Sequence, residues 1–312
     1  MTITQLEYIV SVNTYGSFSK AAAKCFVTQP TLSMQIQKLE EELGVLIFDR
    51  SKKPIKATLI GEEIIRQAQS NLHGIQTIKE IIQEQREEIQ GQLRVGIIPT
   101  LSPYLLPVFV RDFLRNHPKV NLTVEELISE QIIQKLKDDL LYVGILVTPI
   151  EDKSIIEMPL FYEAFMGYFS TNHPLIQHEF IKADELNIDE MLLLSEGHCF
   201  RNQVINICPD SRENQSSNQL KFKSGSLETI KRITEQDYGY TLLPELAVIN
   251  LPEKNKQYVR EINYPKPVRE VSLVIHRGIL KQRLINALKE HILSSVPLHL
   301  KDRNRGQIIS WI

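Results

Sequence analysis

Hydrophobic and polar positions alternate with a helical period in the N-terminal segment. Leu32, Ile36 and Leu39 are four and three residues apart and would lie on one apolar face of a helix. Thr28 stands where an N-cap would begin this helix, and Gly44 stands where a left-handed residue would end it. The pattern therefore predicts a capped helix between these two residues.

The segments on either side of this helix have different patterns. Shorter helical patterns precede it over 4–12 and 18–25, and the alanines of the second would let helices pack closely. After it, β-prone pieces at 46–49 and 55–58 flank a basic turn. Together these patterns predict a small helical domain that ends in a hairpin wing.

Residues 59–90 form one long helical pattern, with charged residues outside its apolar stripe. The stripe steps mostly by three or four residues and consists of Ile65, Ala68, Leu72, Ile75, Ile78, Ile82 and Ile89. A small domain cannot cover a stripe of this length, so a second helix should pair with it. We expect this segment to form a dimer contact rather than to pack only within its own chain.

Strands and helices alternate from about residue 92 onward. β-branched runs predict strands over 93–98, 120–127 and 142–147, with helices between them over 103–116 and 130–141. This alternation is typical of an α/β unit with a parallel sheet.

A second α/β pattern covers about 165–259, and a strand at 266–276 and a helix at 281–293 then return to the first unit. A chain that leaves one lobe, builds a second and returns gives a two-lobed hinge protein. The predicted organisation is an N-terminal domain at 1–58, a linker and dimerisation helix at 59–90, an effector domain at 91–300 with lobe I at about 91–162 and 266–300 and lobe II at about 163–265, and an irregular tail at 301–312.

Composition excludes several classes of protein. The chain has 312 residues, of which 42% are hydrophobic and 24% are charged, so it is not disordered throughout. No uncharged apolar run approaches the ~20 residues of a membrane helix, and residues 1–5 lack the basic and apolar regions of a secretory signal. The 3 cysteines are an odd number, which argues against a secreted disulfide framework. We therefore expect a cytoplasmic protein.

The net charge of −2 by itself argues against a nucleic-acid partner, but the charge is unevenly distributed. Residues 1–58 hold 7 basic and 5 acidic residues, a net charge of +2. The small basic excess therefore lies in the predicted helical domain and wing.

A set of fixed spacings joins the alanine-rich helix, the capped helix and the wing. The residues are Gly16-Ser17-Phe18, Ala21-Ala22, Thr28-Gln29-Pro30-Thr31-Leu32-Ser33-Met34-Gln35-Ile36, Leu39-Glu40-Glu41-Glu42-Leu43-Gly44, Leu46-Ile47-Phe48-Asp49-Arg50, Thr58 and Gly61. This set resembles the winged helix-turn-helix of the LysR-type transcriptional regulators. The resemblance implies an N-terminal all-α winged helix-turn-helix with a long linker helix, followed by an α/β effector domain of two Rossmann-like lobes, similar to periplasmic binding proteins.

A second set of residues resembles the peroxide-sensing members of that family. It consists of Ser195-Glu196-Gly197-His198-Cys199-Phe200-Arg201 with Cys208, Ile97-Ile98-Pro99-Thr100, Pro103-Tyr104-Leu105-Leu106-Pro107, Ser226-Leu227-Glu228-Thr229 and Thr241-Leu242-Leu243-Pro244. This chain departs from the family pattern at Ser129, where relatives have threonine, and at Gln37, where a basic residue is common. The first difference would alter peroxide affinity and the second would alter operator preference.

Cys199 stands at the predicted start of a helix, between His198 and Arg201. A helix N-terminus and nearby cationic groups lower the pKa of a thiol and favour the thiolate, so we expect a reactive Cys199. The resemblance implies that peroxide oxidises Cys199 to sulfenic acid and that Cys208 then forms an intramolecular disulfide with it.

The resemblance also implies a peroxide site made of Thr100, Ser129, His198 and Arg269. The two hydroxyl residues follow predicted strands, where ligands of α/β proteins bind, and could hold a peroxide or a water. The arginine would stabilise the thiolate and the developing oxyanion. Cys25 should be core packing, and the cysteines and His198 lack the paired spacing of a zinc site, so neither a metal nor a cofactor is expected.

The resemblance places the capped helix in the major groove of promoter DNA. Residues at or near its N-terminal end could reach base edges, and these are Gln29, Pro30, Thr31, Ser33 and Gln35. Arg50, Lys52 and Lys53 on the wing would neutralise phosphates. The further partners implied are hydrogen peroxide, RNA polymerase, a thiol reductant of the glutaredoxin or thioredoxin type, and copies of the same chain in a dimer through 59–90 and a tetramer.

Two other functions remain open from the residues. A LysR-type regulator could sense a small metabolite in the cleft between the lobes, with the cysteines incidental, but the motif around Cys199 and Cys208 counts against this. A thiol peroxidase could use the same cysteines in turnover, but the N-terminal helix-turn-helix counts against an enzyme. The redox-switched regulator is the function that we predict.

Overall fold

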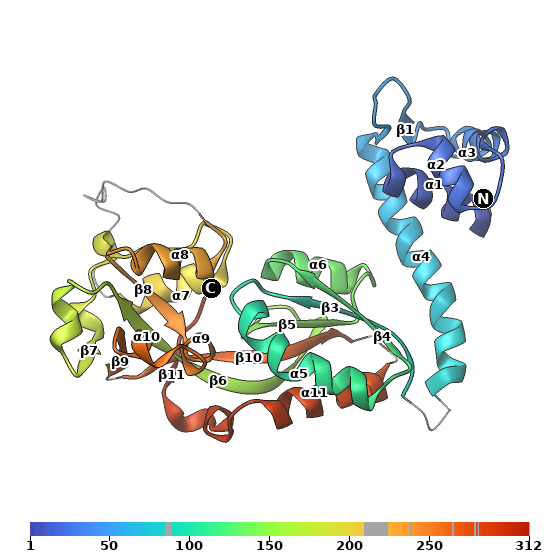
Figure 1. Cartoon of the computed structure of the whole chain (residues 1–312). Coiled ribbons are helices and arrows are strands. Elements are labelled where there is room, and N and C mark those ends of the chain that lie inside the picture. Colours follow the sequence, from blue (N-terminus) through green and yellow to red (C-terminus); the bar gives the residue numbers. More distant parts are fainter. Residues whose placement is uncertain are drawn as a thin grey trace. The chain divides into compact units, whose positions relative to one another are not determined.

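A computed structural model describes residues 1–84, 89–208, 224–237, 239–263, 265–277, 279 and 281–311. Contacts divide the chain into two compact units, which are Met1–Glu87 with the short segment Lys137–Leu140, and Glu88–Leu136 with Leu141–Ile312. Figure 1 shows the elements of both.

The first unit contains the elements predicted for the helical domain and the wing. Its elements are α1 (Ile3–Tyr15), α2 (Phe18–Lys24), α3 (Gln29–Leu43), β1 (Phe48–Asp49), β2 (Lys56–Ala57) and α4 (Leu59–Glu84). The Thr28 side chain accepts a hydrogen bond from the backbone N–H of Thr31, and Gly44 ends α3 with a φ of 70°. Both predicted caps are confirmed, because Thr28 satisfies an orphan amide and glycine adopts the left-handed region without strain.

The core of the first unit lies where its helices meet. Ile9, Leu32, Ile36 and Leu39 are fully buried, so the apolar face predicted for α3 is confirmed at these positions. β1 and β2 pair antiparallel as the predicted wing, although each strand is only 2 residues long.

Helix α4 continues from the wing for 26 residues. Ile65 and Ala68 of its apolar stripe are buried in the core of the first unit. The side chains of Ile78 and Ile82, and the end of the predicted helix at 85–88, lie outside the described residues. Pairing of this stripe with a second chain therefore stays a prediction.

The second unit is built on a nine-stranded sheet with the order β4-β3-β5-β10-β6-β9-β7, in which β8 pairs with β6 and β11 with β10. The strands are β3 (Gly91–Ile97), β4 (Val120–Glu126), β5 (Val143–Thr148), β6 (Ile155–Phe169), β7 (Phe180–Lys182), β8 (Tyr240–Pro244), β9 (Val259–Asn263), β10 (Pro267–His276) and β11 (Gln307–Ile308). β3 pairs in parallel with both β4 and β5, which confirms the parallel α/β unit predicted for the first lobe.

Helices cover both faces of this sheet. They are α5 (Ser102–Asn116), α6 (Ser129–Lys137), α7 (Cys199–Ile207), α8 (Leu227–Thr234), α9 (Glu245–Ile249), α10 (Glu253–Lys256) and α11 (Gln282–Ser295), and five 3₁₀ turns complete the fold. In lobe I, Figure 1 shows α6 on one side of the strands and α5 with α11 on the other.

The two lobes share two long strands. β6 and β10 pair antiparallel from Val268 opposite Ala164 to His276 opposite Ile155. Beyond Ala164, β6 continues and pairs with β8 and β9. Separate apolar clusters fill the two lobes. A residue in the middle of β6 or β10 therefore lies at the junction of the lobes.

The tail is more regular than we predicted. Instead of an irregular segment, it forms 3₁₀ turns at Leu298–Lys301 and Arg303–Arg305, and β11 pairs in parallel with the start of β10. Periodicity could not predict β11, because a strand of 2 residues shows no alternation.

Candidate functional site

Helix α7 begins at Cys199, as predicted, with His198 at the N-cap position. The Cys199 side chain is buried and belongs to the apolar cluster of lobe I, whereas Phe200 and Cys208 belong to the cluster of lobe II. The helix thus starts at the junction of the lobes and runs into lobe II. Its two cysteines lie in different apolar clusters.

Residues far apart in the sequence surround the Cys199 thiol. Thr100 follows β3, Ser129 is the first residue of α6, and Arg269 lies in β10; all three are buried. The Nη1 of Arg269 donates to the Thr100 Oγ1 at 3.0 Å, and its Nη2 donates to the Thr100 carbonyl at 3.2 Å. The Arg269 guanidinium also lies over the Phe200 ring, 5.1 Å from its centroid. The structure therefore brings together the predicted Thr100, Ser129, Cys199 and Arg269.

The electrostatics of the thiol differ from our expectation. Burial raises the pKa of Cys199, while the Arg269 charge, the Ser129 hydroxyl and backbone amides at the start of α7 act in the opposite direction. The predicted lowered pKa was wrong, because full desolvation of the thiolate outweighs these favourable contacts. Arg269 is the largest of the groups that favour the thiolate.

His198 does not supply a positive charge to this site. Burial lowers the pKa of its imidazole, although the Glu126 carboxylate acts against that shift. A half-buried histidine with a lowered pKa is neutral at physiological pH and can donate or accept a hydrogen bond. This corrects our expectation that both His198 and an arginine would favour the thiolate by charge.

The Ser129 hydroxyl has unused hydrogen-bonding capacity. Its oxygen is buried and makes no hydrogen bond of ordinary geometry to another described residue, although it is close enough to Cys199 to favour the thiolate. A buried hydroxyl is stable only when it makes a hydrogen bond. The Ser129 hydroxyl could donate such a bond to the Cys199 sulfur or to a small polar molecule.

Cys208 is the C-cap residue of α7, and burial raises the pKa of its thiol to about 11. Both thiols are free. Nine helical steps of ~1.5 Å place their Cα atoms about 13 Å apart, whereas a disulfide needs less than about 7 Å. The helix predicted for this segment is confirmed, and a Cys199–Cys208 bond is incompatible with it.

One face of α7 forms hydrogen bonds with residues 309–311. The side-chain amides of Asn202, Gln203 and Asn206 donate to the backbone carbonyls of Trp311, Ile309 and Ser310 at 3.1, 2.7 and 2.9 Å. The Trp311 indole in turn donates to the Pro149 carbonyl at 3.0 Å. The segment 307–311 therefore joins β10, the thiol-bearing helix and the start of the β5–β6 connection.

The end of α3 that we predict to read DNA is open to solvent. Gln29, Pro30 and Thr31 are exposed and Ser33 is half-buried, as a base-reading surface requires. Gln35 is less free, because its side-chain and backbone oxygens accept from the Gln5 side chain at 3.4 and 3.3 Å. Its predicted role in base reading would require this contact to α1 to change.

The wing cations also differ from one another. Arg50 pairs with the buried Glu40 at 2.9 Å, and Glu40 in turn accepts from the backbone amides at 47 and 48, so Arg50 fixes the wing to α3. Lys52 lies 3.5 Å from Asp49, and Lys53 is exposed at the tip of the wing. Lys53 is therefore the best placed of the three for a phosphate.

Two models of known domains match this chain. Residues 3–62 match the bacterial regulatory helix-turn-helix protein of the lysR family, and residues 86–297 match the LysR substrate binding domain. The chain belongs to the LysR family. The family and the fold class predicted from the sequence are both confirmed.

Similar members of the LysR family carry informative names. A hydrogen peroxide-inducible genes activator of Haemophilus influenzae is 36% identical over 280 residues, which cover 89% of this chain and 91% of that protein. The DNA-binding transcriptional dual regulator OxyR of Escherichia coli is 33% identical over 301 residues, covering 96% and 97%. The structure of a full-length OxyR variant from Pseudomonas aeruginosa has a TM-score of 0.80 at 34% identity, covering 97% and 98%. The expected similarity to peroxide-sensing LysR members is confirmed.

Sequence reasoning missed Glu163, which is fully buried in β6 and ion-paired with Arg269 at 2.7 Å. Its signal was available, because Glu163 is the charged residue inside the run Leu160-Phe161-Tyr162-Glu163-Ala164-Phe165. A charge in a buried strand requires a partner. The sequence pattern predicted no element over 155–164, so this run was not considered.

A link between the lobes was missed as well. The Tyr104 hydroxyl in α5 donates to Glu228 in α8 at 2.8 Å. Burial and the Glu228 charge raise the pKa of Tyr104, so it stays protonated and keeps donating. This hydrogen bond ties lobe I to lobe II beside the thiol site.

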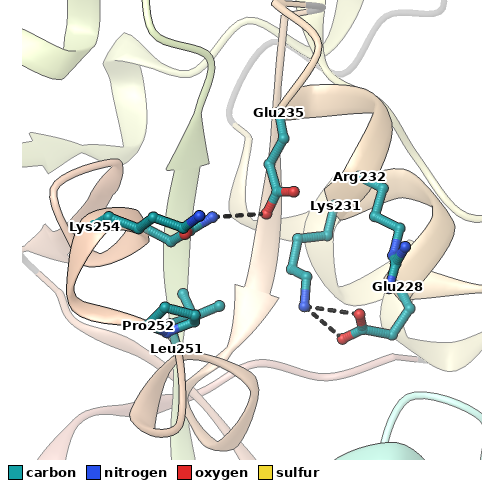
Figure 2. Close-up of a pocket in the computed structure, with 8 residues that line it drawn as sticks. Glu228, Lys231, Arg232, Glu235, Leu251, Pro252 and Lys254 are labelled. Carbon is teal, nitrogen blue, oxygen red and sulfur yellow. Dashed lines mark hydrogen bonds and ion pairs between the residues drawn. The ribbon is translucent and has the colours of Figure 1, made fainter.

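A surface pocket of about 360 Å³ lies entirely within lobe II. Figure 2 shows Lys231 turned toward Glu228 at its rim, with Glu235 and Lys254 opposite. Lys231 and Glu228 are 2.7 Å apart, so the charges on this side compensate each other. The pocket is not the inter-lobe cleft in which a metabolite was considered, and its lining combines three cationic side chains with two carboxylates.

The remaining expectations concern metals, membranes and Cys25. Within the described ranges, no group of three or more His, Cys, Asp and Glu side chains could hold a metal ion. Among the helices that are described, none has the length and apolar character to cross a membrane. Cys25 is partly buried against the core of the first unit, in agreement with a packing role.

Proposed function

We propose that this LysR-family protein is a cytoplasmic transcriptional regulator that binds promoter DNA and is activated when hydrogen peroxide oxidises Cys199. The observation that carries the proposal is the buried site in which Arg269 and the unpartnered Ser129 hydroxyl face the Cys199 thiol. The names of the similar proteins support the same signal. The product would be a Cys199–Cys208 disulfide, and the oxidised protein would control oxidative-stress genes.

The chemistry that we propose has two steps. The Cys199 thiolate attacks one oxygen of hydrogen peroxide, the O–O bond breaks, and the departing hydroxide takes a proton to leave as water. Arg269 stabilises the thiolate and the developing oxyanion, while Thr100, Ser129 and His198 hold and orient the peroxide. The Cys208 thiolate then attacks the sulfenic sulfur, the S–O bond breaks, the departing hydroxide takes a proton to leave as water, and the disulfide forms.

The other partners belong to the same proposal. An extended apolar stripe on α4 supports a dimer through 59–90, and the α/β domain would complete a tetramer. A dithiol reductant of the glutaredoxin or thioredoxin type would take up the two oxidising equivalents and restore both thiols. The DNA-bound oligomer would contact RNA polymerase, and the protein itself would not be an enzyme.

Counting thiols separates this function from its alternatives. After one equivalent of hydrogen peroxide, the protein should lose two thiols once, because Cys199 and Cys208 become one disulfide. A regulator that senses a metabolite would keep all its thiols over the same time. A thiol peroxidase would instead consume excess peroxide continuously when a reductant is present, and that result would contradict the proposal.

The DNA-reading helix and the wing should respond differently to substitution. Gln29→Ala and Ser33→Ala should weaken binding to the specific operator, because these side chains would lose contacts with base edges. Lys53→Ala should weaken binding to every sequence and reduce the salt slope by about one unit, because it removes one phosphate contact. Binding is measured over a salt series on operator and random DNA.

Lys254→Ala is the matched control, because this exposed lysine lies in the α/β domain. It should leave both the affinity and the salt slope unchanged. A Lys53→Ala protein with an altered sequence preference and an unchanged slope would show that the wing does not contact phosphate.

A further inference from the structure

Glu163 and Arg269 stand directly opposite each other on the two strands that the lobes share. Their side chains are 0% and 1% exposed. The Glu163 Oε1 accepts from the Arg269 Nε at 2.9 Å and lies 2.7 Å from its Nη2. The pair is therefore fully removed from water at the junction of the lobes.

The second carboxylate oxygen is occupied too. The Glu163 Oε2 accepts from the backbone N–H of Leu246, the second residue of α9, at 3.0 Å. Because both oxygens of Glu163 are hydrogen-bonded, its carboxylate is held in one orientation. The edge of the Arg269 guanidinium that it contacts is therefore held as well. The remaining edge of Arg269 then points its Nη1 at the Thr100 hydroxyl. Glu163 thus determines where Arg269 lies in the thiol site.

Charge gives Glu163 a second effect. Arg269 is the largest influence that favours the Cys199 thiolate against burial. A carboxylate in contact with the guanidinium compensates part of that positive charge, and compensation is strong where water is excluded. Among the charged and titratable groups near this site, Arg269 from β10 acts on Cys199 itself. Glu163 from β6 contacts Arg269, and Tyr104 from α5 interacts with Arg269, Glu163 and Glu228 of α8. Glu126 from β4 acts on His198, the residue before Cys199.

We propose that Glu163 is a positioning residue of the thiol site, which holds Arg269 against Thr100 and partly neutralises the guanidinium next to Cys199. The proposal rests on the function of Cys199 given above. Partial neutralisation of Arg269 lowers the fraction of Cys199 thiolate. It therefore limits reaction with weak oxidants, because the thiolate is the nucleophile. Peroxide, which can bond to Ser129 and Thr100 within the site, would still react.

Glu163→Gln tests the effect of charge in the full-length protein. The amide keeps the shape and an oxygen for Arg269 and removes the negative charge, while its NH2 group replaces the oxygen that accepts from the Leu246 amide. The ionisation of Cys199, followed by the ultraviolet absorbance of the thiolate against the same protein with Cys199→Ser, should move to lower pH by about one unit. An unchanged midpoint in a folded Glu163→Gln protein would overturn the proposal.

Glu157→Gln is the matched control for that titration. Glu157 lies in the same strand, and its carboxylate accepts from the Ile150 amide at 2.6 Å, away from Arg269. Its substitution should leave the Cys199 midpoint where it is. A shift as large as that of Glu163→Gln would overturn the proposal, because any lost carboxylate would then have the same effect.

Glu163→Asp tests positioning and decides the question if Glu163→Gln does not fold. It keeps the charge but shortens the side chain by one methylene, so Arg269 must move away from Thr100 or lose its partner. Oxidation by peroxide should slow about tenfold or more, because Arg269 and Thr100 are no longer held in the same geometry. Wild-type oxidation kinetics would overturn the positioning role.

These measurements also separate this inference from the function on which it rests. The titration uses no peroxide. A shifted midpoint in Glu163→Gln therefore supports the role of Glu163 even if peroxide oxidises neither the variants nor the wild type. That combination would refute the peroxide function alone. A wild type that is oxidised normally, with titration and kinetics unaffected by either Glu163 variant, would refute this inference alone.

Discussion

Replacing Cys199 by serine should abolish the response to hydrogen peroxide and leave reduced-state DNA binding unchanged. Serine has the shape of cysteine with a slightly smaller side-chain atom at this buried position, so α7 and the contacts around it should persist. Its hydroxyl does not form the anionic sulfur nucleophile that attacks peroxide. Footprints on a target promoter with and without peroxide should be identical for the variant and different for the wild type.

Two further cysteine variants make this result specific. Cys25→Ser should respond like the wild type, because Cys25 lies in the other compact unit. Cys208→Ala should let Cys199 gain one oxygen by mass without forming an intramolecular disulfide. A Cys199→Ser protein whose footprint still changes on peroxide would remove Cys199 from the mechanism.

The same site sets the pH dependence of the reaction. Because burial raises the pKa of Cys199, the thiolate is the minor form at neutral pH and its fraction grows as the pH rises. Oxidation by peroxide should therefore accelerate with rising pH through and above neutrality. A thiol with a lowered pKa, which the sequence led us to expect, would give an oxidation rate that no longer depends on pH near neutrality.

Local signals explain why much of the fold could be predicted. The caps of α3 are read from Thr28 and Gly44, because capping depends on residues within a few positions. The alternation of β3, α5, β4, α6 and β5 follows from runs of β-branched and amphipathic residues. The sharing of β6 and β10 between lobes could not be read in this way, because pairing between distant strands leaves no period in either one.

The thiol site shows the same limit in its chemistry. The resemblance predicted which residues gather: Ser129 and Arg269 act on the thiol, and Thr100 accepts a hydrogen bond from Arg269. It did not predict the sign of the pKa shift, because desolvation depends on the packing of both lobes around one sulfur. For the same reason nothing in the local pattern connects Glu163 with Arg269, which is 106 positions away.

Oxidation should unwind α7 and release the end of the chain together. The two thiols, about 13 Å apart in the helix, can bond only if the helix between them opens. Opening removes Phe200, Val204 and Ile207 from the core of lobe II, where each is buried. It also breaks the bonds from Asn202, Gln203 and Asn206 to the segment 309–311, since their donors share one helical face.

Hydrogen exchange tests this coupling directly. The amides of 200–207 and of 307–311 should both lose protection on oxidation, because local opening exposes every amide of a cooperative unit. Asn206→Ala with Asn202→Ala should weaken protection of 309–311 in the reduced protein and leave 200–207 less affected. Equal protection of both segments in the two redox states would refute the unwinding.

The single tryptophan gives a second and simpler readout. Trp311 donates to the Pro149 carbonyl and accepts from Asn202 of α7, so its surroundings change when the helix opens. Its fluorescence should change when peroxide is added to the wild type, at the rate of disulfide formation, and stay constant in Cys199→Ser. A change at the earlier rate of sulfenic acid formation would show that the segment responds before the helix unwinds.

Unwinding should also make the disulfide easy to reduce. Each apolar side chain that leaves the core costs roughly 1.5–3 kcal/mol if it is not buried again. A net penalty of about 3 kcal/mol would raise the reduction potential of the cysteine pair by roughly 65 mV. Equilibration with glutathione measures this potential, and deletion of 307–311 should lower it, because the reduced form then loses part of its stabilisation. A potential unaffected by the deletion would show that the end of the chain does not stabilise the reduced helix.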